Sequence, residues 1–288
     1  MVIQEYSPLK YPNSKKYLVP FFELICDKCE PPCDYFIEPF GGGCEVGLNL
    51  LVNKRVKRLY INDYDRGVAS VWNTIIENPK WLTQTIRHTD VTLEEWYRQR
   101  EYVQTHDEIS HKMGFATLFL NRTSVGGYLN GNPIGGYYGD TKKTIEGAFN
   151  KMDVGLKIRL LTRYKKQLTS NDYDIKYWNQ RCVQLIYNKA LIFYDPPCQK
   201  NEAVSLFPWS LSDHKEFIDS MRYVPHGRRW IITIDQNKEI NGLYNSVFEV
   251  HTYHTQREDR DIGIMYSHKE LIPTQRELDD RETGLTIA

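Results

Sequence analysis

The sequence predicts an α/β protein with a Rossmann-like, largely parallel sheet into which a mainly helical segment is inserted. Short apolar runs alternate with helical patterns before residue 78 and after residue 167, as they do where helices cover parallel strands. A glycine run directly follows the first apolar run, and residues 79–166 contain no strand-like run. We therefore expect one domain from residues 1–78 and 167–288, and an inserted helical domain from residues 79–166.

The amino-terminal elements predict a ligand-binding turn. Residues 8–25 begin with turn-forming residues and continue as a short apolar helix, and residues 35–39 form the first expected strand. Glycines at 41–43 allow the backbone to approach a ligand, and the helix expected from Val46 directs its positive end at that turn. A glycine run alone also fits dinucleotide enzymes, but their third glycine is missing because position 46 is Val.

The second expected strand, residues 58–62, leads into Asp63, which lies 22 residues after Gly41. An acidic residue at this distance can accept hydrogen bonds from both hydroxyl groups of a ribose. Many nucleotide cofactors contain a ribose, so Asp63 does not decide between them. The helix that covers this strand is expected at residues 68–77.

The tetrapeptide Asp195-Pro196-Pro197-Cys198 follows the apolar run 191–194, which predicts a buried strand. Two prolines cannot donate hydrogen bonds to a sheet, so the strand must end at Asp195, at the edge where such sheets bind ligands. The Asp195 carboxylate and the Pro196 carbonyl are both acceptors and suit a substrate with an NH2 group. Taken alone, however, Asp-Pro-Pro is equally typical of an ordinary turn.

The rest of the chain contributes a long loop and the late strands. Residues 119–139 join the end of a helix to a loop rich in glycine and aromatic residues, and long loops in compact proteins are usually functional. Strands are expected at residues 168–173, 230–235 and 247–253, with residues 262–266 paired to one of the late strands. A helix begins near Ser212, and the tail beyond Ser267 is expected to be irregular.

Composition indicates an ordinary soluble protein, because 41% of the residues are hydrophobic and 26% are charged. The amino terminus lacks a signal-peptide pattern, and no apolar run reaches the length of a membrane span, so we expect a cytoplasmic protein. We also expect a monomer or weak dimer. The 37 basic and 37 acidic residues balance, but residues 141–166 contain eight Lys or Arg against Glu146 and Asp153. That local charge of +6 suits a phosphate backbone, or equally a solvated helix face.

Three of the six cysteines, Cys26, Cys29 and Cys33, lie close together. A structural zinc site needs four ligands, and the only other nearby cysteine is Cys44 in the glycine turn. We therefore expect no metal and a loop of reduced cysteines.

Five motifs occur in the order found in the alpha group of Dam-like (D12 class) N6-adenine DNA methyltransferases, which the sequence resembles over about residues 8–266. They are Tyr11-Pro-Asn-Ser-Lys15, Glu38-Pro-Phe-Gly-Gly-Gly43, Asn62-Asp63, Asn121-Arg122-Thr123 and Asp195-Pro-Pro-Cys198. The resemblance implies S-adenosylmethionine (SAM) as cofactor and double-stranded DNA as partner. It implies a cofactor site formed by Tyr11, Lys15, Glu38, Pro39, Phe40, Gly41, Gly42, Gly43, Asp63, Asp172, Tyr173 and Asp195, with Trp178 competing for the adenine, and DNA contacts from Asn121, Arg122, Tyr128 and Asn132. To these the basic stretch adds Lys165 and Lys166.

The same resemblance makes Asp195, Pro196, Pro197 and Cys198 the catalytic motif, acting on the N6 amine of an adenine that has left the duplex. The family has Tyr where this chain has Cys198, which removes an aromatic face from the reacting base. Phe207 or Trp209 could supply such a face. The alternatives are a weak or inactive sequence-specific DNA-binding homologue, or an enzyme that methylates cytosine N4 or RNA.

Overall fold

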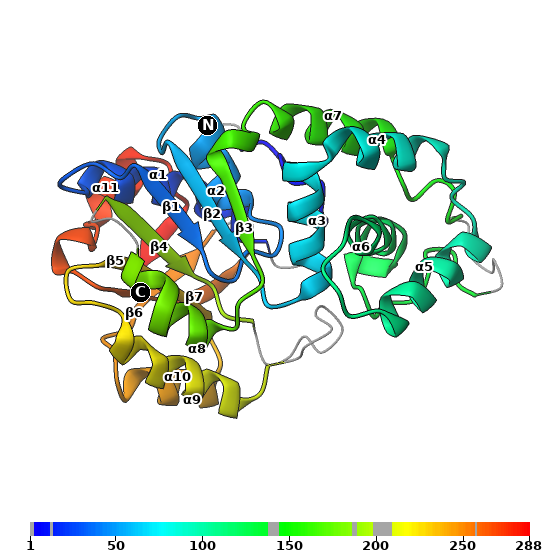
Figure 1. The fold of residues 1–288 in the computed structure, drawn as a ribbon. Helices are drawn as coiled ribbons and strands as arrows, with labels where there is room; N and C mark the ends of the chain where they lie inside the picture. Colours follow the sequence, from blue (N-terminus) through cyan, green and yellow to red (C-terminus); the bar gives the residue numbers. More distant parts are fainter. Residues whose placement is uncertain (1–2, 12–13, 138–143, 186–188, 198–208, 257) are drawn as a thin grey trace.

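The computed structural model describes residues 3–11, 14–137, 144–185, 189–197, 209–256 and 258–288. These residues form an eight-stranded sheet in the order β3-β2-β1-β4-β5-β7-β6-β8 (Figure 1). The strands are β1 (Tyr35–Glu38), β2 (Arg58–Asn62), β3 (Leu168–Asn171), β4 (Ala190–Tyr194), β5 (Arg229–Asp235), β6 (His251–Thr255), β7 (Arg260–Tyr266) and β8 (Leu285–Ile287). Strands β1 to β5 are parallel, whereas β7 is antiparallel to both β5 and β6. The predicted α/β fold is confirmed.

Strand β4 shows why the sheet is covered on both faces. Leu191 and Phe193 belong to one apolar core, and Ile192 and Tyr194 belong to a second. Successive side chains of a strand point to opposite faces, so an unbroken apolar run requires a helical layer on each side. The Phe193 ring lies 4.4 Å from Phe22 of α1 on one face.

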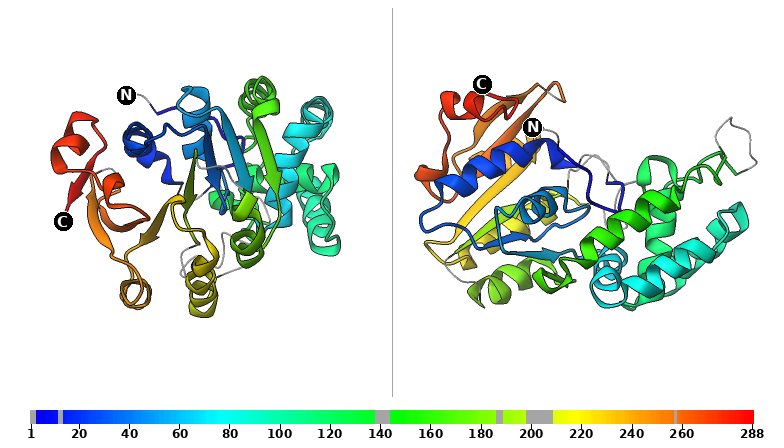
Figure 2. Two further views of the ribbon diagram at one scale, coloured as in Figure 1. Left: turned by 60° about the vertical axis from the view of Figure 1, so that its left-hand side comes forward. Right: turned by 90° about the horizontal axis from the view of Figure 1, so that it is seen from above.

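Helices α1 (Val19–Lys28), α2 (Glu45–Val52) and α3 (Arg66–Glu77) contribute to the first core. Helices α9 (Leu211–Ser220) and α10 (Lys238–Asn245) form the second layer, together with the segment that begins at α8 (Ile175–Tyr177). Figure 2 shows the sheet between these layers. Pro20 in the first turn of α1 favours a helix start, because proline has the φ of a helix and needs no hydrogen bond there.

Between α3 and β3 the chain forms α4 (Pro79–His88), α5 (Leu93–Thr105), α6 (His111–Thr123) and α7 (Lys151–Thr162). In Figure 1 α6 lies beside α3, and α5 lies on the far side of α6. Side-chain oxygens of Thr92, Ser110 and Asn150 accept backbone N–H bonds at the starts of α5, α6 and α7. Helix α6 approaches α3 closely at Gly114, where a Cβ would lie 2.5 Å from the Ser70 carbonyl oxygen. The helical segment and α3 therefore share one packed core.

Short helical turns link these elements. They are η1 (Lys15–Leu18), η2 (Val125–Gly127), η3 (Lys165–Gln167), η4 (Trp178–Cys182), η5 (Val183–Leu185), η6 (Met221–Tyr223) and η7 (Lys269–Leu271). None of the helices in the described ranges has the length and apolar character needed to cross a membrane.

The carboxyl-terminal tail differs from the expectation of irregular structure. It forms α11 (Gln275–Asp280) and then β8, which pairs with β6. Thr274 and Glu277 form a reciprocal capping box at the start of α11, and Leu278 and Leu285 are buried. A capping box and two buried leucines order a short polar segment that has no long apolar run.

Candidate active site

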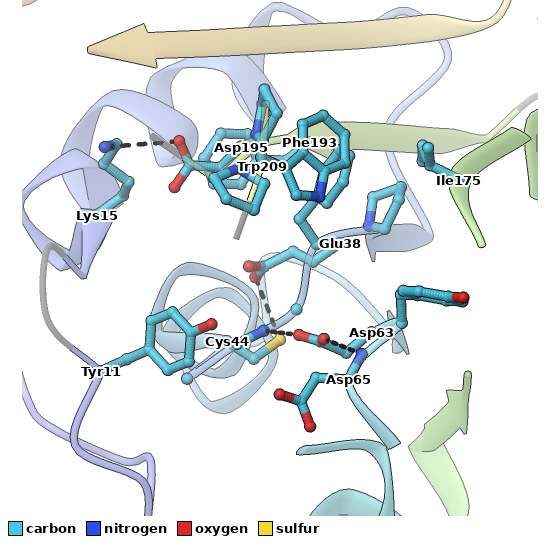
Figure 3. Close-up of a pocket in the computed structure, with 18 of the residues that line it drawn as sticks. Tyr11, Lys15, Glu38, Cys44, Asp63, Asp65, Ile175, Phe193, Asp195 and Trp209 are labelled. Carbon is cyan, nitrogen blue, oxygen red and sulfur yellow. Dashed lines mark hydrogen bonds and ion pairs between the residues drawn. The ribbon is translucent and has the colours of Figure 1, made fainter. Parts of the chain in front are cut away.

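The carboxyl ends of the parallel strands surround a cavity of about 390 Å³ (Figure 3). Glu38 ends β1, Asp63 follows β2, Asp195 follows β4 and Asp235 ends β5, and all four line the cavity. The volume suits a small-molecule ligand, and this edge is where open α/β sheets bind ligands. Of the residues expected to contact the cofactor, only Asp172 is missing from the cavity lining. The others all line it: Tyr11, Lys15, Glu38, Pro39, Phe40, Gly41, Gly42, Gly43, Asp63, Tyr173 and Asp195.

The glycine turn between β1 and α2 has no room for side chains. A Cβ on Gly41 would lie 2.4 Å from Cγ2 of Ile61. Gly42 has a positive φ of 46°, and a Cβ there would lie 2.9 Å from the ring of Tyr11. The indole N–H of Trp72 in α3 donates to the Gly42 carbonyl at 3.0 Å, which fixes the position of the turn. The turn is a rigid backbone wall of the cavity.

Cys44, which stands at the last position of the turn, is compatible with this wall. It caps α2 in the left-handed conformation with a φ of 53°, and its thiol donates to a carboxylate oxygen of Glu38 at 3.3 Å. That same oxygen accepts the backbone N–H of Gly47 at 2.7 Å. Burial raises the pKa of Glu38 to about 8, so this side chain carries a proton over much of the neutral range.

Asp63 holds the opposite side of the turn. Its carboxylate accepts the backbone N–H of Gly42 at 2.7 Å and that of Asp65 at 2.9 Å. Burial, together with the nearby Asp65 carboxylate, raises the pKa of Asp63 to about 7. A carboxylate has about four lone-pair sites, so two remain for ligand hydroxyl groups.

The Asp195 carboxylate is the centre of a buried charge network. It accepts the Thr233 hydroxyl at 2.6 Å, and the ammonium group of Lys15 lies 3.6 Å away. Lys15 also contacts Asp235 at 2.9 Å, and Asp235 contacts Arg260 at 3.3 Å. Burial works against the charge of Lys15, but Asp195 and Asp235 outweigh it and raise the pKa of Lys15. Burial likewise raises the pKa of Asp195, and Lys15 and Thr233 oppose that rise.

The wall after β3 is fixed by Asn62. Its side chain accepts the Tyr173 N–H at 3.0 Å, donates to the Tyr173 carbonyl at 2.8 Å, and donates to the Pro39 carbonyl at 3.0 Å. Asp174 and Ile175 line the cavity beyond Tyr173. The acidic residue at this wall is therefore Asp174 rather than the expected Asp172, while Trp178 is buried against Tyr194 in the second core.

An aromatic wall lies next to Asp195-Pro196-Pro197. Trp209 lines the cavity and packs edge-on against Phe40, with ring centroids 5.1 Å apart. Behind it lies His214, whose Nδ1 hydrogen-bonds the Tyr244 hydroxyl at 3.0 Å, and burial lowers the pKa of His214 to about 4. His214 is thus a neutral core residue. Cys198 and Phe207 lie outside the described residues.

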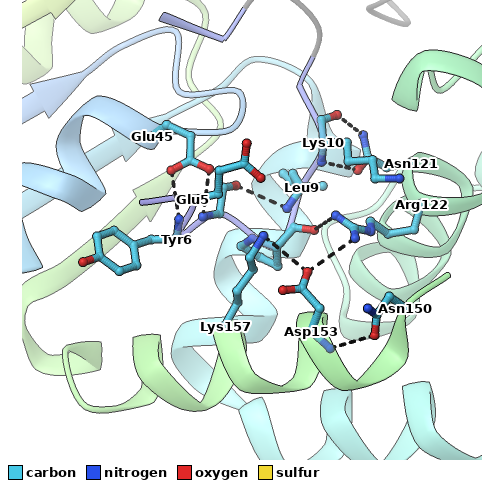
Figure 4. Close-up of polar contacts among 12 residues, drawn as sticks. Glu5, Tyr6, Leu9, Lys10, Glu45, Asn121, Arg122, Asn150, Asp153 and Lys157 are labelled. Atoms are coloured by element: carbon cyan, nitrogen blue, oxygen red, sulfur yellow. Dashed lines mark hydrogen bonds and ion pairs between the residues drawn. The ribbon is translucent and has the colours of Figure 1, made fainter. Parts of the chain in front are cut away.

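The residues expected to contact DNA occupy three different environments. Asn121 and Arg122 are buried, at 2% and 5% exposure, and their polar groups bind other parts of the chain (Figure 4). Tyr128 is half-buried and Asn132 is exposed, in the loop that follows α6. Lys165 and Lys166 are exposed but precede the first residue of β3. Because β3 is parallel to β2, this is the opposite edge of the sheet from the cavity.

The cysteine loop carries free thiols. Cys26, Cys29 and Cys33 are buried and reduced, and no metal-binding group of His, Cys, Asp or Glu occurs within the described ranges.

Strand order and site together define a class of protein. Five parallel strands, one antiparallel strand inserted between β5 and β6, a glycine turn after β1 and carboxylates after β2 and β4 are the features of a Rossmann-like methyltransferase. The family model described as "D12 class N6 adenine-specific DNA methyltransferase" matches residues 11–258, and the chain belongs to this family. It is a SAM-dependent enzyme that methylates the N6 amine of adenine in DNA.

Other comparisons add less. None of the curated proteins matches the chain. Two solved structures of the rRNA methyltransferase aviRa from Streptomyces viridochromogenes are similar, with TM-scores of 0.45 and 0.43. Both are 10% identical in sequence, and the alignments cover 91% of this chain and 88% of aviRa.

Proposed function

We propose that the cavity at the carboxyl edge holds both SAM and an adenine that has been extruded from duplex DNA, and that Asp195 and Pro196 act on the adenine amine. The observation that carries this proposal is the position of Asp195. Its carboxylate lies in the same cavity as the glycine turn and Asp63, and Lys15 and Thr233 hold it in place.

The chemistry of the cavity fits SAM. The glycine turn leaves backbone where a Cβ would collide, Asp63 keeps acceptor capacity, and acidic side chains dominate the lining, which suits a cation. We assign the ribose to Asp63 and the adenine of the cofactor to the wall at Tyr173 and Ile175. SAM supplies an electrophilic methyl group on a positively charged sulfur.

Asp195 and the Pro196 carbonyl would prepare the amine for attack. The lone pair of an aromatic amine is delocalised into the ring, and two acceptors on its hydrogens draw the nitrogen toward a tetrahedral geometry. Positive charge develops on that nitrogen, and an ionised Asp195 stabilises it without prior removal of a proton. Lys15 and Thr233 serve this role because both lower the pKa of Asp195 and so oppose the effect of burial.

We place the DNA along the carboxyl edge and assign target recognition to the inserted helices at residues 79–166. The loop after α6, residues 124–133, is closed by a bridge between Ser124 and Pro133 and carries the exposed Asn132. Near the cavity, Tyr173 and Lys176 are exposed. Aromatic and cationic groups of this kind suit an unstacked base and a phosphate backbone.

The test is transfer of labelled methyl groups from SAM to unmethylated DNA of mixed sequence, with RNA as a parallel substrate. We expect N6-methyladenine in DNA, loss of activity in Asp195→Ala, and nearly unchanged duplex binding in that variant. Comparison of the methylomes of cells with the gene and with an empty vector would give the recognition sequence. Label in cytosine or RNA alone would contradict the proposed substrate.

Substitution of Cys198 tests whether the enzyme is fully active or is weakened relative to Dam-like enzymes. If the missing ring of Cys198 limits the enzyme, Cys198→Tyr should raise kcat/KM by roughly 5- to 150-fold, which corresponds to about 1–3 kcal/mol of base stacking. If Cys198→Tyr lowers a robust wild-type rate, Trp209 already supplies the aromatic face. Tight binding of one sequence without methylation by either protein would favour the DNA-binding alternative.

A further inference from the structure

The amino-terminal segment of residues 5–11, here called the strap, is held at helix α2 and the glycine turn. The carboxylate of Glu45, the first residue of α2, accepts the backbone N–H groups of Tyr6 and Ser7, each at 3.1 Å. Glu45 follows the glycine turn directly and itself lines the cavity. The strap ends at Tyr11, whose ring packs on Gly42. Any displacement of the strap therefore reaches the cofactor turn at two points.

The other fastening of the strap is to the inserted helices, through Asn121 at the end of α6 (Figure 4). The Asn121 side chain accepts the Lys10 N–H at 2.8 Å and donates to the Lys10 carbonyl at 2.7 Å. It also donates to the Gly127 carbonyl at 2.8 Å. One buried amide thus joins the strap to the loop 124–133 and uses both of its donors and its acceptor to do so.

Gly127 and Arg122 complete this joint. A Cβ on Gly127, whose φ is +80°, would lie 2.6 Å from the Lys10 carbonyl oxygen, so only glycine allows the loop to touch the strap. Arg122 donates to the Pro8 carbonyl at 3.4 Å and lies 3.6 Å from Asp153 of α7. Within its seven residues the strap is held by side chains of α6 and α2, and Asp153 of α7 in turn contacts Arg122.

We infer that Asn121 is a positioning residue for the cofactor turn, acting through the strap, and that DNA on the loop 124–133 thereby changes the affinity for SAM. The second part rests on the proposed function. The physical reason is that loop, strap and glycine turn are joined by buried hydrogen bonds and a close ring contact. A ligand that orders the loop also orders Tyr11 and Gly42, and the ordering cost of the second ligand falls.

Calorimetry of the full chain with S-adenosylhomocysteine, which cannot react, tests this inference with and without short mixed-sequence duplexes. In the wild type, the duplex should tighten binding by about 5- to 150-fold, the usual range of coupling between two sites. The ratio of the S-adenosylhomocysteine affinity with the duplex to that without it should fall close to 1 in Asn121→Ala. This variant should also bind S-adenosylhomocysteine several-fold more weakly without DNA. In turnover, it should raise KM for SAM much more than it changes kcat.

Gly127→Ala is the second variant, because it displaces the strap without removing a polar group and remains informative if Asn121→Ala fails to fold. The matched control is Asn49→Ala. Asn49 is also buried and donates to the carbonyl of Gln4, the residue before the strap, at 3.1 Å. It lies in α2, and its side-chain hydrogen bonds within the described residues go to Gln4 and Glu45 rather than to the inserted helices. It should keep the wild-type ratio.

A folded Asn121→Ala protein that keeps the wild-type ratio would overturn the inference. The inference would also fail if the duplex lost its effect on S-adenosylhomocysteine affinity to the same extent in Asn49→Ala. That result would indicate that either substitution loosens the packing around the strap in a non-specific way. If the wild type binds no duplex at all, the proposed DNA substrate fails. The DNA-free comparison then still decides the role of the strap, since unchanged affinity in both Asn121→Ala and Gly127→Ala would refute it.

Discussion

Replacement of Lys15 by Met should shift the pH dependence of methyl transfer to higher pH. Lys15 is the cation that opposes the effect of burial on Asp195, and its ammonium group lies 3.6 Å from that carboxylate and 2.9 Å from Asp235. Without it, two buried carboxylates face each other, and the pKa of Asp195 must rise further. In the proposed mechanism only the ionised form of Asp195 stabilises the positive nitrogen, so activity should appear as pH rises through the pKa of Asp195.

The size of the shift follows from the 3.6 Å separation of Lys15 and Asp195. With an effective dielectric constant of about 20, the attraction is about 4–5 kcal/mol, which would move the pKa by about 3 units if it were lost completely. Water that enters the space and protonation of Asp235 recover part of this energy. We therefore expect the acidic limb of the kcat profile to move up by about 1–2 units.

The assay is single-turnover methyl transfer at saturating SAM from about pH 6 to about pH 9, the range in which such a limb is visible. Thr233→Val, which removes the 2.6 Å hydrogen bond to Asp195 but no charge, is the control and should shift the limb by about 1 unit or less. A Lys15→Met profile with an unmoved limb would refute this account of Asp195. A uniform loss at every pH would show that Lys15 acts on SAM alone.

Four other predictions concern the cavity and the DNA surface. Asp63→Asn should abolish the pH dependence of SAM affinity seen by calorimetry, because the pKa of Asp63 is about 7 and wild-type binding should tighten as pH rises through that value. The free wild-type protein should melt at progressively lower temperature from about pH 4 to about pH 7, since the folded state keeps a proton on Asp63 that the unfolded chain releases, and Asp63→Asn should flatten this slope. Trp209→Ala should lower kcat/KM by roughly 5- to 150-fold through lost stacking, with Trp209→Phe close to wild type; equal losses in both would remove Trp209 from the base site. Lys176→Ala should reduce the salt slope of duplex binding by about 1, whereas the double Lys165→Ala, Lys166→Ala variant should leave it unchanged, and the reverse result would move the DNA to the other edge of the sheet.

Local sequence signals predicted the sheet and much of the cavity wall. Apolar runs located β1, β2 and β4, and the prolines after Asp195 fixed the end of a strand and hence the place of its carboxylate. No local sequence pattern predicted the charge network around that carboxylate. Asp235 at the end of β5 contacts Lys15 from 220 residues further along the chain, and Arg260 contacts Asp235 because β7 pairs with β5.

Asn121 and Arg122 show the opposite limitation. The family resemblance implied that both residues contact DNA, but both are buried because the strap, which comes from the amino-terminal end of the sequence, packs over them. The position of the acidic residue in the cavity wall after β3 likewise depended on a contact between distant residues. Asn62 clamps the backbone of Tyr173, and this places Asp174, two residues beyond the expected acid, against the cavity.

The acidic lining of the cavity also bears on turnover. Among the described lining residues, two are lysines, Lys15 and Lys176, and nine are acidic. Glu38 is one of the nine and carries a proton over much of the neutral range; the other eight are Glu45, Asp63, Asp65, Asp174, Asp195, Asp213, Glu216 and Asp235. Methyl transfer converts the sulfonium of the donor into a neutral thioether, so the spent cofactor loses the positive charge that this wall attracts. The acidic wall should therefore bind S-adenosylhomocysteine less tightly than SAM, and SAM should displace it because of its positive charge. Product inhibition should be weak, and weakest at low ionic strength, where the field of the carboxylates is least screened.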